Sequence, residues 1–151
     1  MREIVGKPAG AGLRIAIVVA RFNRSVTESL LDGALECLRD YGVADDAIDV
    51  LRVPGAFEIT VAAEHCAASG RYAALICLGA VVRGETPHFE FISREVSRGV
   101  NDVACRHRIP VAFGVLTTDN MEQALARAGE GHGNKGYEAA ITALEMAALL
   151  R

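Results

Sequence analysis

Four apolar runs that alternate with helical segments constrain the fold of this chain more than any other feature. The first, Leu13–Ala20, reads LRIAIVVA and holds a single charged residue, as expected for a strand that is buried on both faces. Strands separated by helices predict right-handed crossovers and a parallel sheet that lies between layers of helices. The three later runs are Ile48–Val53, Ala73–Val82 and Pro110–Leu116.

Helical patterns fill the segments between these strands. Ser25 and Glu28 have the spacing of a capping box, which predicts that a helix begins there. The apolar face of that helix holds Leu30, Leu31, Ala34, Leu35 and Leu38. A shorter apolar helix is predicted over 58–68, and a longer one follows the third strand. In the longer helix, Thr86 is the expected N-cap and Pro87 the expected first helical residue.

The last part of the chain predicts two more helices with a break between them. Asn120 is the expected cap of the first, whose inward face holds Met121, Ala124, Leu125 and Ala128. The glycine-rich segment 129–136 interrupts the pattern, and a final helix is predicted over 137–150. The order β-α-β-α-β-α-β-α-α predicts a three-layer α/β/α sandwich with a central four-stranded parallel sheet, in a flavodoxin-like arrangement.

The first twelve residues follow a weaker pattern than the rest. Three glycines and one proline within 1–12 predict a flexible N-terminal arm, in which Glu3–Val5 can add an edge strand to this sheet or to that of another chain. No linker long enough to divide domains interrupts residues 13–151. We therefore expect residues 13–151 to form a single domain.

Composition and charge exclude several classes of partner. The 151 residues carry a formal net charge of −3 and no basic cluster, which argues against nucleic acid and membrane surfaces. No segment has transmembrane length, and the first residues lack the apolar core of a signal peptide, so a cytoplasmic location is expected. Four widely spaced cysteines in apolar segments predict reduced, buried thiols rather than a metal site: Cys37, Cys66, Cys77 and Cys105.

Polar and aromatic residues follow the predicted strands at their carboxyl ends, where parallel α/β sheets bind ligands. The loop Gly79–Gly84 lacks the Lys-Ser/Thr pair of a nucleoside triphosphate site, and the first strand–helix turn lacks the glycine pattern of a dinucleotide site. Nucleophile-elbow and His-Glu-x-x-His patterns are missing as well. The segments that should meet at the strand ends are 22–23, 56–58, 81–88 and 113–118.

The turn before the third helix predicts an anion site, because a helix N terminus presents free backbone N–H groups. His88, in the first turn of that helix, can accept a proton, or it can simply cap or pack. Phe22 is suited to stacking on a ligand or to core packing, and Glu58 to complementing a helix dipole or to binding the hydroxyl groups of a polyol. Arg127 and Lys135 are surface cations unless the fold brings them to the anion site.

Five ordered blocks resemble the lumazine synthase family, and the resemblance covers nearly the whole chain. The blocks are RFN (21–23), VPGAFEI (53–59), CLGAVVRGETPHFEFI (77–92), PVAFGVLTT (110–118) and NKGYEAA (134–140). The resemblance implies a transferase of riboflavin biosynthesis that uses no metal or organic cofactor. Such an enzyme condenses 5-amino-6-ribitylaminouracil with 3,4-dihydroxy-2-butanone 4-phosphate, giving 6,7-dimethyl-8-ribityllumazine, phosphate and water.

The resemblance also implies roles for individual residues. His88 would shuttle protons, while Glu85, Thr86 and Arg127 would bind phosphate. The pyrimidine and its ribityl chain would lie against ten residues, the last three of which would face the pocket from a neighbouring subunit: Phe22, Asn23, Ala56, Phe57, Glu58, Val81, Val82, Phe113, Lys135 and Glu138.

Assembly is a further implication of the resemblance. The family forms homopentamers, and some members pack twelve pentamers into a sixty-subunit shell that associates with riboflavin synthase. The short segment 129–136 resembles that of shell-forming members, whereas Pro8 cannot donate a hydrogen bond if the arm pairs with a neighbouring sheet, so both assemblies stay open. Two other functions compete with this one. A catalytically weak flavin-binding or shell-forming relative would lack some of these site residues, but the sequence has them all. A doubly wound nucleotide or signalling domain would carry phosphate-binding or acidic-cluster motifs, which the sequence does not show.

Overall fold

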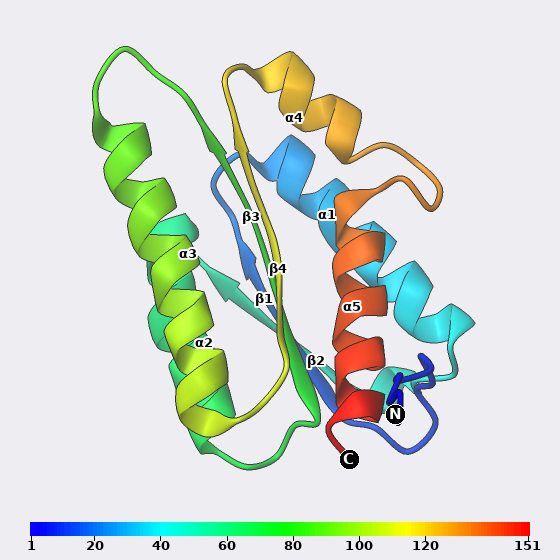
Figure 1. Cartoon of the computed structure of the whole chain (residues 1–151). Helices are drawn as coiled ribbons and strands as arrows, with labels where there is room; N and C mark the ends of the chain where they lie inside the picture. The colour runs from blue at the N-terminus through cyan, green and yellow to red at the C-terminus, as the bar shows by residue number, and fades with distance from the viewer.

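Four parallel strands form the centre of the protein in the computed structural model, which describes all residues from Met1 to Arg151 (Figure 1). The strands are β1 (Ile15–Ala20), β2 (Ile48–Val53), β3 (Ala74–Val82) and β4 (Val111–Thr118). Their order across the sheet is β2-β1-β3-β4, and every neighbouring pair is parallel. The predicted sheet is therefore confirmed, but residues 1–12 add no strand to it.

Helices cover both faces of this sheet, as Figure 1 shows. One layer holds α2 (Ile59–Ala68) and α3 (His88–His107), and the other holds α1 (Arg24–Asp40), α4 (Met121–Arg127) and α5 (Lys135–Leu149). All six residues of β1 are buried, and alternate ones belong to separate hydrophobic clusters on the two faces. The predicted three-layer α/β/α sandwich is thus confirmed, and none of its helices is long and apolar enough to cross a membrane.

Two predicted helix starts differ from the structure. Helix α1 begins at Arg24, after Asn23 in the left-handed conformation (φ 61°), and no side chain caps it. The capping box of Ser25 and Glu28 is therefore wrong, because Ser25 already lies inside the helix and Glu28 forms an ion pair with Arg52 of β2. In α3, Pro87 takes the N-cap position rather than the first helical position.

Burial departs from the prediction at three positions. Met121 and Leu125 are exposed, because the two turns of α4 contact the core only through smaller residues, Ala124 and Ala128. Cys105 is also exposed, on the last turns of α3, whereas the other three cysteines are buried as predicted. Burial raises the pKa values of the Cys37 and Cys77 thiols to about 12.

The N-terminal segment lies against the ends of two helices of its own chain. The backbone N–H of Gly10 donates to the carbonyl of Tyr41 at 2.8 Å, beyond the end of α1. Gly6 is buried beside the backbone of Glu145 and Leu149 in α5, where a Cβ atom would collide. The division into an arm over 1–12 and a domain over 13–151, and the flexibility of the arm, stay predictions.

Asn134 joins three helices at the break before α5. Its buried side-chain amide donates to the carbonyl oxygens of Ser29 in α1, Ala128 after α4, and Gly129, at 2.9–3.1 Å. Its side-chain oxygen accepts from the first N–H groups of α5, those of Gly136 (2.7 Å) and Tyr137 (3.1 Å). One side chain therefore caps α5 and fixes it against α1 and α4.

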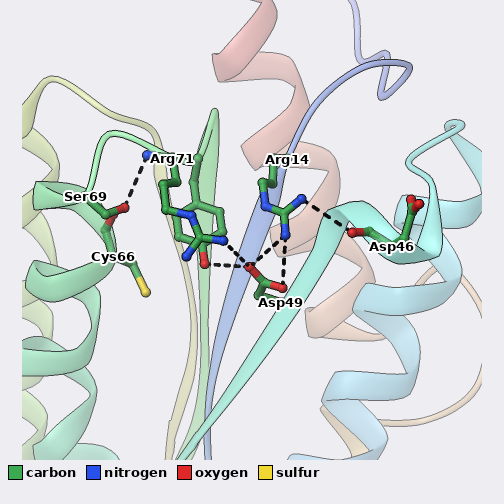
Figure 2. A network of polar contacts seen from close by, with 7 residues as sticks. Arg14, Asp46, Asp49, Cys66, Ser69 and Arg71 are labelled. Atoms are coloured by element: carbon green, nitrogen blue, oxygen red, sulfur yellow. Dashed lines mark hydrogen bonds and ion pairs between the residues drawn. The ribbon is translucent and has the colours of Figure 1, made fainter.

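A second polar network lies at the opposite, amino-terminal end of the sheet (Figure 2). Asp49 of β2 accepts a hydrogen bond from the Tyr72 hydroxyl at 2.6 Å and forms ion pairs with Arg14 (3.4 Å) and Arg71 (3.7 Å). The Tyr72 hydrogen bond and the two arginines hold the pKa of Asp49 below its ordinary value. The same contact raises the pKa of Tyr72.

Replacing Asn134 by Asp should destabilise the protein by about 2–4 kcal/mol, because a carboxylate can cap α5 but cannot donate to three buried carbonyl oxygens. Asn120→Asp is the matched control, since the side chain of exposed Asn120 makes one hydrogen bond, which it accepts from the Gln123 N–H at 2.8 Å. That control should change the free energy of unfolding by about 0.5 kcal/mol or less. Urea unfolding at one fixed protein concentration measures both, and equal effects would contradict the role given to Asn134.

Asp49→Asn should remove a pH-dependent part of the stability. Because the folded-state pKa of Asp49 lies below the ordinary value of 3.8, its contribution is complete well above pH 3.8 and is lost as the pH falls through the folded-state pKa. The difference in unfolding free energy between wild type and Asp49→Asn should therefore be largest near neutral pH and shrink in acid. Tyr72→Phe, which leaves both arginines in place, should remove only part of it, and a difference independent of pH would refute this account.

Candidate active site

A cavity of about 610 Å³ opens beyond the carboxyl ends of β1, β2 and β3. The chain leaving β1 contributes Phe22 and Asn23, and the turn after β2 contributes residues 54–58. The end of β3 and its loop contribute Ala80, Val81, Val82, Gly84 and Thr86. Helix α3 closes the cavity with His88, Phe89 and Ile92. The predicted convergence at the strand ends is confirmed for the first three strands.

Asn23 holds the floor of this cavity together. Its side-chain amide donates to the carbonyl oxygen of Ala80 at 2.9 Å, which joins the end of β1 to the end of β3. The backbone N–H of Phe22 bonds to the carbonyl of Pro54 at 3.1 Å, which joins the same turn to the end of β2. Chains leaving β1 and β2 pass to opposite faces of the sheet, so a crevice forms between them.

Two side chains at the cavity, those of Phe22 and Glu58, are available to contact a ligand. The Phe22 ring is 71 % exposed, so the core-packing interpretation of this residue is wrong. Glu58 stands at the N-cap of α2 but makes no capping hydrogen bond, which leaves its carboxylate open to a ligand. Gly55 passes close to this carboxylate, where a Cβ atom would lie 3.3 Å from Oε1. The cavity thus offers an aromatic face and a free hydrogen-bond acceptor.

The anion site is predicted at the loop between β3 and α3. The backbone groups of Gly84, Glu85 and Thr86 take part in no backbone–backbone hydrogen bond, so their N–H groups are free. Thr86 and His88 line the cavity, and the Thr86 hydroxyl accepts from the His88 N–H at 3.4 Å. Glu85 is exposed on the loop but does not line the cavity.

The remaining predicted site residues lie around a second cavity of about 380 Å³, between β4 and α5. Its lining includes Phe113, Arg127, Lys135 and Glu138. Lys135 Nζ lies 2.8 Å from Glu138 Oε2, and Arg127 donates to the Gln123 carbonyl at 2.9 Å. Strand β4 forms one edge of the sheet, so this cavity faces outward at that edge.

One chain therefore does not bring the predicted phosphate ligands together. Thr86 lines the first cavity and Arg127 the second, and the two cavities share no residue. Within a single chain, therefore, the fold does not bring Arg127 and Lys135 to the cavity of the Thr86 turn. Elsewhere in the chain, no three His, Cys, Asp or Glu side chains are grouped in a way that could hold a metal ion.

Comparison of the sequence with those of known proteins relates the whole chain to one family. A sequence model described as 6,7-dimethyl-8-ribityllumazine synthase matches residues 12–151. The chain belongs to this family. Proteins named 6,7-dimethyl-8-ribityllumazine synthase from two strains of Clostridium kluyveri are 53 % identical to it over 151 residues, covering 100 % of this chain and 98 % of theirs.

Within this lumazine synthase fold, the sequence did not predict every residue of the first cavity. Phe89 and Ile92 pack against the core, and both also line the cavity, because they lie on the inward face of α3 close to its first turn. Arg83 does not line the cavity but contacts its wall, because its guanidinium lies over the Phe89 ring, 4.4 Å from the centroid. Phe89 could have been predicted as a cavity residue from its position, because it lies on the inward face of the first turn of a helix that follows a strand end.

Proposed function

We propose that this chain condenses 5-amino-6-ribitylaminouracil with 3,4-dihydroxy-2-butanone 4-phosphate to form 6,7-dimethyl-8-ribityllumazine. Membership of the lumazine synthase family supports this reaction. The observation that carries the proposal is the first cavity, which combines an exposed aromatic ring, a free carboxylate and a loop with unpaired N–H groups. These three features suit a pyrimidine, a polyol and a phosphate in turn.

The pyrimidine substrate is proposed to occupy the floor of the first cavity. Phe22 would stack on the ring beside Asn23, and the backbone of Val81 and Val82 would contact its edge. Glu58 would accept hydrogen bonds from the ribityl hydroxyl groups. The turn that precedes α2 would hold the rest of the ribityl chain through Ala56 and Phe57.

The phosphorylated substrate is proposed to lie at the loop before α3. The free N–H groups around Glu85 and Thr86 would bind its phosphate. Since Arg127 lies at the second cavity, it would reach this phosphate from a neighbouring subunit, together with Phe113, Lys135 and Glu138. The proposed active site is thus formed by the first cavity of one chain and the second cavity of the next.

A shared site of this kind requires an oligomer. The proposed assembly is the homopentamer, with twelve pentamers in a shell and association with riboflavin synthase as further steps. Phe113, an exposed apolar side chain that lines the second cavity, fits a surface that another subunit covers. The cytoplasm is the proposed compartment, because a charged phosphate ester does not cross a bilayer unaided.

The proposed mechanism starts with attack of the uracil amine on the ketone and loss of water to give an imine. Proton removal and elimination then expel phosphate, whose charge the Thr86 loop and Arg127 stabilise. The enol tautomerises, and the ribityl-bearing nitrogen closes the ring with loss of a second water. Because an amine and a ketone react without help, holding the two substrates together supplies most of the acceleration. His88, exposed at the cavity, moves protons.

The direct test is to mix both substrates with the protein and follow lumazine fluorescence and phosphate release. The wild-type chain should form both products, and His88→Ala should slow turnover by about 10²–10⁴-fold at most while leaving activity above the uncatalysed rate. Absence of product with the assembled wild-type protein would refute the proposed function. A His88→Ala protein that assembles but has no activity above background would refute the secondary role of His88.

Complementation between subunits tests the shared site. Phe22→Ala damages the first cavity and Arg127→Ala the second, so each variant alone should be weakly active. Co-expression of the two in equal amounts should restore wild-type sites wherever an intact first cavity meets an intact second cavity, which occurs at about a quarter of the positions in a random ring. Activity of the mixed assembly at the average of the two variants would show that each site lies within one chain.

A further inference from the structure

The loop from Gly84 to Thr86 is held by few interactions of its own. Its three residues are exposed and form no backbone–backbone hydrogen bonds, and the one bond of the Thr86 side chain, to the His88 N–H, is long at 3.4 Å. A loop of this kind has many accessible conformations, whereas an anion site needs its N–H groups in one arrangement. Some other group must therefore fix where the loop starts and where it ends.

Arg83 contacts both ends of this loop. Its backbone N–H donates to the Thr118 carbonyl at 2.8 Å, which fixes the start of the loop to the end of β4. Its guanidinium donates through Nε to Asp119 at 2.9 Å and pairs through Nη1 with Glu90 in the first turn of α3. The same guanidinium lies over the ring of Phe89, the residue after His88.

The contacts of the Arg83 guanidinium argue against a direct role in binding phosphate. Two carboxylates and an aromatic face already occupy its guanidinium, and the hydrogen bond from Arg83 is the main cause of the lowered pKa of Glu90, so the pair stays charged at neutral pH. Both ion pairs are exposed, and exposed pairs contribute little to global stability because water screens them. The network is therefore suited to ordering a local segment rather than to holding the fold.

We propose that Arg83 is a positioning residue that sets the conformation of the Gly84–Thr86 loop and the first turn of α3, and through them the phosphate-binding and proton-transfer half of the active site. This inference rests on the proposed function. It predicts that the pyrimidine half does not depend on Arg83, because Phe22 and Glu58 follow β1 and β2, and Val81 and Val82 are held by their pairing with β4. It also requires arginine, because only a forked guanidinium can reach both Asp119 and Glu90 while it lies over the Phe89 ring.

Steady-state kinetics on the assembled protein with each substrate varied in turn tests the proposal. Arg83→Ala should lower kcat/KM for the butanone phosphate by about 10- to 100-fold, since small displacements of a site have effects of this size. The KM for the pyrimidine should stay within about twofold, because its contacts lie elsewhere. Arg83→Lys, which keeps one charge but not the fork, should fall between the two proteins.

Two further variants keep the result decisive if Arg83→Ala does not assemble. Glu90→Gln removes the partner in α3, so it should impair use of the butanone phosphate in the same direction and have little added effect in Arg83→Lys. Arg106→Ala is the matched control, because Arg106 forms a similar exposed pair with Glu64 (2.9 Å) at the far end of α3 and should leave both substrates unaffected.

Three outcomes would count against the inference. Unchanged kcat/KM for the butanone phosphate in assembled Arg83→Ala and Glu90→Gln proteins would overturn it. An equal rise in the KM values of both substrates would overturn it as well, because it would indicate general disorder of the site. An inactive wild-type protein would instead refute the proposed function, so the two failures are distinguished in the same assay.

Discussion

The two central strands, β1 and β3, are hydrogen-bonded along both edges and covered by helices on both faces. Every residue of β1 and all but the last of β3 are buried, so neither strand has room for an unpaired polar side chain. Polar side chains of this region therefore gather at the strand ends. The carboxyl ends carry the first cavity, and the amino ends carry the Asp49 network.

This constraint explains why the sheet could be predicted from sequence. Strands buried on both faces, such as β1 and β3, need continuous apolar runs. The edge strands β2 and β4 are partly exposed, but all four predicted runs coincide with strands to within two residues at either end. Helix ends were harder because they depend on distant partners. The side chain of Glu28 pairs with Arg52 on a strand instead of closing a capping box, and α5 begins where Asn134 reaches α1 and α4.

The candidate site shows the same division between local and distant information. Phe22, Glu58 and His88 were brought together because all strands of a parallel sheet point the same way, which is a property of topology rather than of spacing. The separation of Arg127 from Thr86 could not be predicted, since it depends on which edge of the sheet α4 covers. Arg83 was missed because its partners, Glu90 and Asp119, lie on different elements and have no shared motif.

The two cavities also set a condition on how copies of the chain can be arranged. They share no residue and use different elements, so each copy presents two unlike surfaces, one for each neighbour. An open row of copies joined through these surfaces would leave one unused half-site at each end. A closed ring leaves none, and its number of complete sites equals its number of chains. In the proposed shared-site enzyme, ring closure therefore maximises the number of complete active sites per chain.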